Sequence, residues 1–158
     1  MSAETVRKYL KTKGFEDKIT VHAGSIDTEE HAAQQIGCSE AEIAKTLSFL
    51  IDGKPLIIVM AGDGRVNSSK FKGAFHTKPR MIPRDDVVEC IGHEPGGVCP
   101  FAIKEGIPVW LDISLKRFAA IHPAAGDEYT SVELTPEELE TASDACGWCD
   151  VCKGWEEQ

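Results

Sequence analysis

Residues 92–101 have the composition of a loop that could bind a carbonyl group. They run Gly-His-Glu-Pro-Gly-Gly-Val-Cys-Pro-Phe, so three glycines and two prolines fall within ten residues. Glycine reaches backbone conformations that other residues avoid, and proline fixes the chain on either side of them. Successive backbone N–H groups of such a loop can point at a carbonyl or an oxyanion. A plain tight connection between two elements is the alternative interpretation.

Two titratable side chains belong to the same hypothesis. Lys45 follows Ile43-Ala44 at the start of a mainly apolar strand, where its ammonium could point from a sheet end into a cleft. His93 lies in the glycine-rich segment and could act as an acid or a base near neutral pH. Ordinary solvated side chains are the alternative for both. The sequence has no Gly-x-Ser-x-Gly elbow, so hydrolysis here would use a water nucleophile or help from the substrate.

Three of the six cysteines are spaced as Cys146-x-x-Cys149-x-x-Cys152. A redox Cys-x-x-Cys pair is expected where a helix follows a strand, because the helix dipole lowers the thiol pKa. This one comes after the last helical pattern instead. A structural zinc site needs four ligands, and no second Cys-x-x-Cys or histidine pair accompanies these three. Thiol oxidoreduction through Cys146 and Cys149 stays open as a less favoured alternative, and no metal or other cofactor is expected.

The charges are segregated along the chain, although they sum to −9. Residues 127–158 contain ten acids and one base, and residues 65–84 contain six cations and no acid. Clustered cations can attract a polyanion even when the total charge is negative. Residues 65–84 are therefore a candidate nucleic-acid surface, with a solvated loop and helix face as the alternative.

Length and composition indicate one globular domain over residues 1–158. A chain of 158 residues lies within the usual range of a single domain. Its 42% hydrophobic and 27% charged residues exclude a disordered or fibrous protein. The longest apolar stretch, residues 55–61, is too short to span a membrane, and the charged N-terminal segment lacks the apolar core of a signal peptide. A cytoplasmic protein without a membrane partner is expected.

The apolar pattern predicts an α+β fold with a curved, mixed, barrel-like sheet flanked by helices. Alternation at residues 46–51, then Asp52-Gly53, then an apolar run at 55–60 is a strong hairpin signal. Further strands are expected at residues 19–23, 107–113, 117–122 and 131–134. Helices are expected from the start to Gly14, at 28–36, after Asn67 to 75, at 84–91 and from Thr135. The expected core is Leu47, Phe49, Leu56, Ile58, Val59, Val109, Leu111 and Ile113.

Four segments, in this order, resemble the YbaK/EbsC-type aminoacyl-tRNA deacylases, which are related to the editing insertion of bacterial prolyl-tRNA synthetase. They are Ile43-Ala-Lys45-Thr-Leu, Ala61-Gly-Asp-Gly-Arg-Val66, Gly92-x-x-Pro-Gly-Gly-Val-x-Pro-Phe101 and Pro108-Val-Trp-Leu-Asp112. The resemblance extends over residues 32–139, most of the chain. It implies an α+β fold and hydrolysis of the ester that joins a wrong amino acid to the 3′ end of tRNA.

The resemblance also implies roles for individual residues. Lys45 matches the lysine that holds the terminal nucleotide near the ester, and Gly97 belongs to the loop whose backbone amides face the aminoacyl carbonyl. These two are the expected catalytic residues. The expected substrate-binding residues are Gly92, His93, Pro95, Gly96, Val98, Cys99, Pro100 and Ser131. The expected tRNA-docking residues are Arg65, Lys70, Lys72 and Lys78, with the acidic C-terminal segment held away from them.

The predicted function is a stand-alone deacylase that edits mischarged tRNA. Its expected partner is the 3′ acceptor end of aminoacyl-tRNA, with an aminoacyl-tRNA synthetase as a second candidate and no DNA. An aminoacyl ester is already activated, so a placed water and two oxyanion donors, each worth about 2.7–4 kcal/mol, could supply most of the catalysis. A non-catalytic RNA- or protein-binding module of the same fold is the alternative, although the pairing of Lys45 with an intact loop argues against it.

Overall fold

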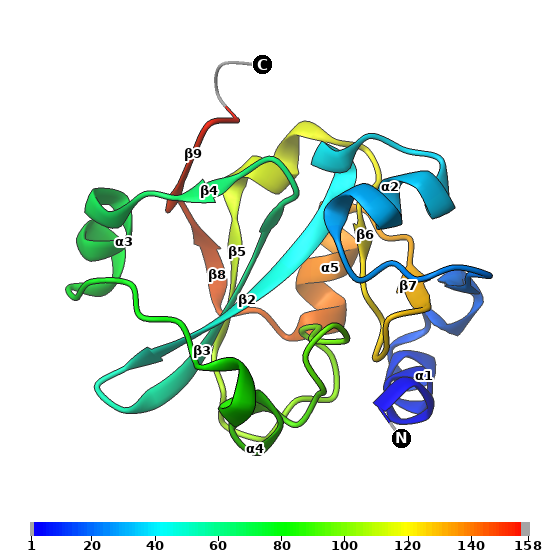
Figure 1. Ribbon diagram of the computed structural model, residues 1–158, viewed down its shortest axis with the longest axis horizontal. Helices are drawn as coiled ribbons and strands as arrows, with labels where there is room; N and C mark the ends of the chain where they lie inside the picture. Colours follow the sequence, from blue (N-terminus) through cyan, green and yellow to red (C-terminus); the bar gives the residue numbers. More distant parts are fainter. Residues whose placement is uncertain (1, 156–158) are drawn as a thin grey trace.

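A five-stranded mixed sheet with strand order β6-β2-β3-β5-β8 forms the centre of the computed structural model, which describes residues 2–155 (Figure 1). Its strands are β2 (Ile43–Ile51), β3 (Lys54–Ala61), β5 (Val109–Asp112), β6 (His122–Pro123) and β8 (Gly147–Cys149). The pair β2–β3 is antiparallel, and the other neighbours are parallel. Two small antiparallel pairs accompany this sheet: β1 (Ile19–Val21) with β7 (Thr130–Val132), and β4 (Arg65–Val66) with β9 (Cys152–Lys153). The predicted curved, mixed α+β fold is confirmed.

Among the described residues, five α-helices accompany the sheets. They are α1 (Ser2–Lys13), α2 (Glu29–Ile36), α3 (Ser68–Phe75), α4 (Val87–Ile91) and α5 (Pro136–Ser143). Thr28, Asn67 and Thr135 each accept a hydrogen bond from the backbone N–H three residues later, which satisfies an unpaired helix donor. Among the described residues, no helix is both long and apolar enough to cross a membrane.

The hairpin between β2 and β3 turns at Asp52 and Gly53, as predicted. Both residues have positive φ, 51° and 76°, which is the backbone of the type I′ turn that Asp-Gly favours. The turn sets a register in which Ile51 pairs with Lys54 and Ala44 with Ala61. In Figure 1, β2 crosses the molecule from the side of α2 to this turn. Lys45 is therefore held at the opposite end of the strand from the hairpin.

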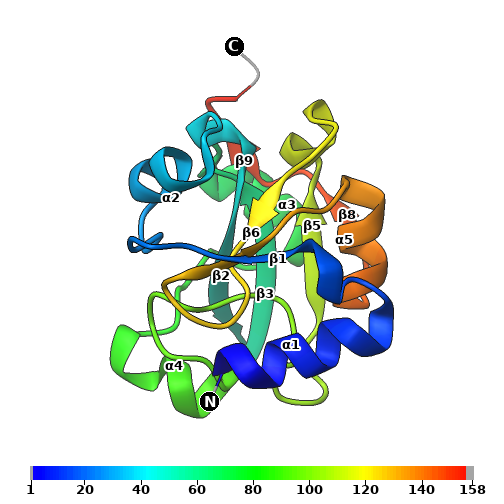
Figure 2. The same cartoon turned by 90° about the vertical axis from the view of Figure 1, so that its right-hand side faces the viewer.

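Strand β3 is apolar on both faces because both faces are buried. Ile57, Val59 and Ala61 belong to a core cluster with residues of α1 and α5. Leu56, Ile58 and Met60 belong to a second cluster, with α3 and the C-terminal residues. Figure 2 shows the end of α1 beside α5, where Lys13 pairs with Asp144 at 2.6 Å. Six of the eight predicted core residues are buried, and Leu47 and Ile113 are only half-buried.

Two parts of the chain differ from expectation. The strand expected at 117–122 does not form. A 3-10 turn covers Ile113–Arg117, and the segment after it joins the sheet only at His122. Asp112 causes the turn, because its carboxylate accepts from the Ser114 N–H and caps it. The C-terminal cysteine segment forms β8 and β9, which were not predicted. Strands of two or three residues have too little pattern of their own, and their partners β5 and β4 define them.

Candidate active site

Lys45 and part of the glycine-rich loop meet in one cleft of about 360 Å³ beside β2. Strand β6 pairs only with Ile43 and Ala44, and pairing on this edge resumes at the bridge between Phe49 and Met81. The Ser48 carbonyl already accepts from the Ile82 N–H at 3.0 Å, so the edge of β2 is open at residues 45–47, and this opening is one wall of the cleft. The other lining residues include Pro95, Gly96 and Val98 of the loop, together with Glu29 of α2, Arg84, His122 and Ala124.

The Lys45 ammonium is held by one carbonyl and one carboxylate. Its Nζ lies 3.4 Å from the Gly62 carbonyl oxygen, to which it donates, and 3.5 Å from Glu29 Oε1. The Lys45 side chain is 22% exposed, so it remains open to a ligand. Glu29 is the first residue of α2, where the helix dipole favours a negative charge. Both contacts are long, so an incoming phosphate can replace Glu29 without breaking a strong ion pair.

The loop presents Gly96 and Val98 to the cleft, but not Gly97. Within residues 2–155, the backbone N–H groups of Gly96 and Val98 make no hydrogen bond, so both donors are free for a ligand. The Gly97 N–H donates to the Glu94 carbonyl at 3.0 Å. A Cβ on Gly97 would lie 2.8 Å from Asp127 Cα and 2.9 Å from the Gly126 carbonyl oxygen. Gly97 thus lets the loop pack against residues 126–127, and its own amide is not one of the free donors.

His93 and Cys99 lie under the loop, inside the core, and not in the cleft. His93 Nε2 is 2.7 Å from the Phe101 carbonyl oxygen, and since a carbonyl only accepts, Nε2 carries the proton. Burial lowers the pKa of His93, so the ring is neutral. Burial likewise raises the pKa of Cys99 to about 12. These side chains brace the loop, and the expectation that His93 serves as an acid or base facing substrate is corrected.

The other expected substrate-binding residues divide in the same way. Pro95 lines the cleft, whereas Pro100 is buried outside it and Gly92 ends α4 with a φ of 105°. Ser131 is buried on β7, where its Oγ lies 2.7 Å from His22 Nε2. Ala124, which follows β6 and pairs with Ser131, lines the cleft in its place, and it has no hydroxyl to offer a substrate. The sequence therefore points to a loop that lines the cleft, but its list of substrate-binding residues also includes residues buried outside the cleft.

Two polar side chains of the cleft were not singled out from the sequence. Thr46 lines the opening, and its buried Oγ1 has no hydrogen-bond partner within the described residues. His122 also lines the cleft. Burial lowers the pKa of His122, and the nearby carboxylates of Glu133 and Glu42 act in the opposite direction. A histidine before a proline carries no pattern that marks it as a site residue, so only the pairing of β6 with β2 reveals it.

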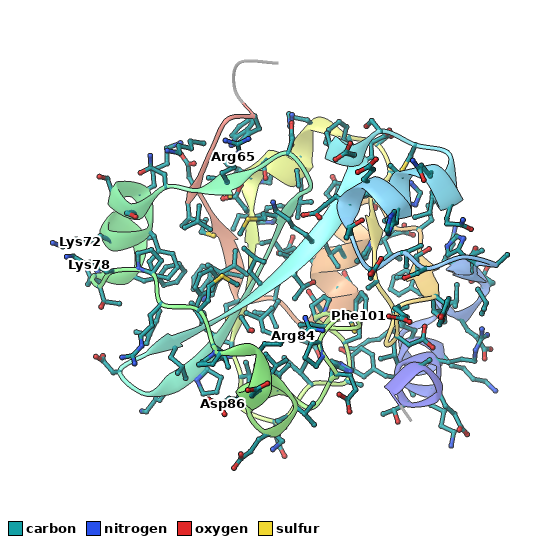
Figure 3. All side chains as sticks on the ribbon, viewed as in Figure 1. Arg65, Lys72, Lys78, Arg84, Asp86 and Phe101 are labelled. Carbon is teal, nitrogen blue, oxygen red and sulfur yellow. The ribbon has the colours of Figure 1, made fainter. Side chains whose placement is uncertain are left out.

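The basic residues 65–84 do not form one free surface. Lys70 Nζ contacts Asp150 Oδ1 at 3.1 Å and the Cys152 carbonyl oxygen at 3.0 Å, so it binds the C-terminal segment. Arg65 pairs with Lys153 through β4 and β9. The expectation that the acidic segment stays away from the basic one is therefore wrong. Figure 3 shows Lys72 and Lys78 together at the α3 edge of the molecule, well apart from Arg84, which lines the cleft.

The cysteine segment lacks the surroundings of a redox pair. Cys146 is exposed, Cys149 half-buried and Cys152 buried. Burial, with added repulsion from Asp112, raises the pKa of Cys149 to about 12 and raises that of Cys152 as well. Cys149 is the last residue of β8, and no helix follows it in the described part of the chain, which ends at residue 155. Cys149 and Cys152 are therefore protonated at neutral pH and are poor nucleophiles.

A second cavity, of about 940 Å³, is larger than the cleft but holds none of the expected catalytic or substrate-binding residues. It lies beyond the hairpin end of the sheet, with Phe75, Trp110 and Trp148 among its lining residues. The smaller cleft is lined both by Lys45 and by Gly96 and Val98, whose backbone N–H groups are free. The chemistry therefore places the candidate active site in the smaller cleft.

The fold and this cleft define a tRNA editing domain. The family described as the aminoacyl-tRNA editing domain matches residues 23–142, and the chain belongs to this family. Protein YwhH of Bacillus subtilis (strain 168), which is uncharacterized, is 43% identical over 157 residues, or 99% of this chain and 100% of that protein. EbsC of Enterococcus faecalis, named as a candidate Cys-tRNA(Pro)/Cys-tRNA(Cys) deacylase, is 27% identical over 70% of this chain and 68% of its own.

A solved structure supports the same assignment. It is described as a candidate trans-editing enzyme for prolyl-tRNA synthetase, and it superposes with a TM-score of 0.87 at 27% identity. The match covers 97% of this chain and 98% of that one. The resemblance stated from the sequence motifs is confirmed.

Proposed function

We propose that this protein is a stand-alone cytoplasmic deacylase, one editing domain over its whole length, that hydrolyses the ester of mischarged tRNA. The observation that carries the proposal is the cleft that Lys45 lines together with Gly96 and Val98, whose N–H groups make no hydrogen bond within residues 2–155. An ammonium at the mouth suits the phosphate of a terminal nucleotide, and free backbone donors suit a carbonyl that becomes an oxyanion. Membership of the aminoacyl-tRNA editing family supports the same chemistry.

The proposed reaction divides its work between binding and transition-state stabilisation. Lys45 binds the terminal nucleotide and brings the ester to the loop, which contributes proximity. Water attacks the ester carbon, and the Gly96 and Val98 amides donate to the developing oxyanion. Each such donor is worth about 2.7–4 kcal/mol when well placed. The bond between the ester carbon and the ribose oxygen then breaks, and the proton of the attacking water reaches that oxygen through the neighbouring ribose hydroxyl or through a water that a backbone carbonyl orients, which leaves a free amino acid and a tRNA with a 3′ hydroxyl.

The cleft favours a small amino acid as the misplaced group. Its volume of about 360 Å³ must also admit the ribose of the terminal nucleotide. Ala32, Ile43 and Val87 add apolar side chains to the lining of the cleft. The name of EbsC, which specifies cysteinyl-tRNA, supports the same size class.

A deacylation panel tests the proposal directly. The purified protein is incubated with tRNAs charged with alanine, cysteine, serine, threonine or proline, and the remaining ester is measured over time. We expect turnover of at least one small aminoacyl group in proportion to enzyme concentration. Binding of charged tRNA without hydrolysis of any of the five would instead identify a non-catalytic RNA-binding module.

Removing the charge of Glu29 should improve substrate binding. The Glu29 carboxylate competes with the substrate phosphate for Lys45, and an exposed ion pair is worth about 0.2–1 kcal/mol. Glu29→Gln should therefore lower the KM for charged tRNA about two- to fivefold. Glu30→Gln, one residue further along α2 and exposed, is the matched control and should leave KM unchanged. A higher KM in Glu29→Gln would show that the carboxylate contacts the substrate.

The exposed cations near α3 are proposed to dock the acceptor stem. Reversing Lys72 and Lys78 to Glu, with Lys70 left in place, should raise the KM for charged tRNA on the order of fivefold at low salt. It should also reduce the slope of log binding against log salt by about 2. Arg7 and Lys11, exposed on α1 at the opposite side of the molecule, provide a matched double reversal (Figure 1). Equal KM values in both variants would remove α3 from the binding surface.

A further inference from the structure

The turn after β3, residues 61–64, is the part of the structure that holds Lys45 from behind. The Gly62 carbonyl accepts from Lys45 Nζ at 3.4 Å, and the Gly62 N–H donates to the Ala41 carbonyl at 3.3 Å. A Cβ on Gly62 would lie 1.9 Å from the Glu40 carbonyl oxygen, so the turn is seated directly on the preceding 3-10 turn, Glu40–Glu42. Any shift of this turn moves the carbonyl that directs Lys45.

Asp63, in the middle of this turn, is fixed by a bidentate ion pair with Arg117. Arg117 Nη1 lies 3.0 Å from Asp63 Oδ2, and Nη2 lies 2.5 Å from Oδ1. The two side chains are only 21% and 18% exposed. Arg117 is itself fixed, since its Nε donates to the Ser114 carbonyl at 2.9 Å. Two parallel charge-assisted hydrogen bonds define both the position and the orientation of the Asp63 carboxylate.

The C-terminal residues cover this ion pair. The Trp155 ring lies 5.1 Å from Arg117 Cζ, and the Trp155 carbonyl accepts from Arg117 Nη1 at 3.5 Å. Phe118 provides a second ring, 4.7 Å from the same Cζ. Trp155 is tied back by its Nε1, which donates to the Cys152 carbonyl at 3.3 Å. The guanidinium is therefore contacted by aromatic rings from two segments while its N–H groups bind Asp63.

The cysteine segment, residues 146–152, also contacts the turn at residues 61–64. A Cβ on Gly64 would lie 3.4 Å from both Cβ and Sγ of Cys152, so these residues are in close contact. The segment is anchored by Asp112, which accepts from the Val151 N–H at 2.8 Å. Burial raises the pKa of Cys152, and the charge of Lys45 opposes that rise, so the ammonium lies within electrostatic reach of the segment.

We propose that Arg117 and Trp155 are positioning residues for Lys45, acting through Asp63 and the Gly62 carbonyl. The proposal rests on the proposed function, in which Lys45 binds the terminal nucleotide. It gives the C-terminal segment a role that is neither redox chemistry nor metal binding: the segment holds the turn at residues 61–64 in place. Without the Asp63–Arg117 pair, the turn keeps the Gly62–Ala41 hydrogen bond but loses its side-chain anchor, so the Gly62 carbonyl holds Lys45 in a less defined position.

A double-mutant cycle separates positioning from general stability. Arg117→Ala should lower kcat/KM for charged tRNA about tenfold, less than the hundredfold that a displacement of about 1 Å can cost. In a Lys45→Ala background the same change should have no further effect, because the residue it positions is gone. Lys116→Ala is the matched control, since Lys116 lies in the same 3-10 turn over the Trp148 ring and does not touch Asp63. It should leave kcat/KM unchanged.

A chemical measurement provides a readout besides activity. Acylation of Lys45 by a water-soluble amine reagent, quantified by mass spectrometry, should become severalfold faster in Arg117→Ala and in Trp155→Leu, while the other lysines react as before. If Arg117→Ala does not fold, Arg117→Lys keeps the charge but loses the bidentate geometry, and it should show a smaller effect of the same kind.

The outcomes distinguish this inference from the function on which it rests. Equal losses from Arg117→Ala in the wild-type and Lys45→Ala backgrounds, or unchanged Lys45 acylation, would overturn the positioning role and leave the deacylase standing. Full activity in Lys45→Ala would instead overturn the assigned role of Lys45, and the positioning role with it.

Discussion

Lys45→Ala should lower deacylation by about tenfold to a hundredfold while the protein stays folded. A hydrogen bond to a charged group is worth about 1.5–3 kcal/mol, and each 1.4 kcal/mol is a factor of ten. The fold should tolerate the change, because the Lys45 contacts to Gly62 and Glu29 are 3.4 and 3.5 Å long. The measurements are kcat/KM on the preferred charged tRNA and a thermal melt of each variant.

Lys54→Ala is the matched control for this experiment. Lys54 begins β3, is exposed, and lies at the hairpin end of the same pair of strands, outside the cleft. It should retain the wild-type rate. A Lys45→Ala protein that hydrolyses as fast as Lys54→Ala would disprove the assignment of the cleft as the active site.

Gly97→Val should also lower activity by about tenfold or more, but mainly through kcat. The added Cβ would lie 2.8 Å from the backbone of Asp127, so the loop must move away from residues 126–127. Gly96 and Val98 move with it, and their N–H groups no longer point at the oxyanion. An interaction made only in the transition state affects kcat more than KM. The expected cause is therefore displacement of the loop, and not obstruction of the carbonyl by a valine in the cleft.

Gly73→Val provides the comparison, because Gly73 lies in α3 with no heavy atom within 4 Å of an added Cβ. Both variants introduce the same side chain, and thermal melts show how much stability each loses. If Gly97→Val keeps the kcat of Gly73→Val, the loop amides are not the oxyanion donors.

The tertiary structure also explains why several loop residues expected at the substrate do not line the cleft. Its composition indicates a tight, unusual backbone, but not the direction of each side chain. His93 and Cys99 turn inward, toward the Phe101 carbonyl, and Gly97 turns toward residues 126–127. Only the packing of the loop on neighbouring segments leaves Gly96 and Val98 facing the cleft. The composition of the loop can be seen in the sequence, whereas the exposure of each of its residues depends on the segments packed against it.

The sequence by itself determined the features that depend on neighbouring residues. Asp52-Gly53 adopts the positive φ values of a hairpin turn, and Thr28 and Thr135 cap helices through bonds that span three residues. The ordered motifs around Lys45 and the glycine-rich loop likewise identified the family.

The tertiary structure decided what depends on partners far along the chain. Strands β8 and β9 exist because β5 and β4 pair with them, and Lys70 binds Asp150 across eighty positions of sequence. His122 reaches the cleft only because β6 pairs with the start of β2. A short strand or a single charged side chain carries little local preference, so its role is set by the free energy of contacts that form only when the chain has folded.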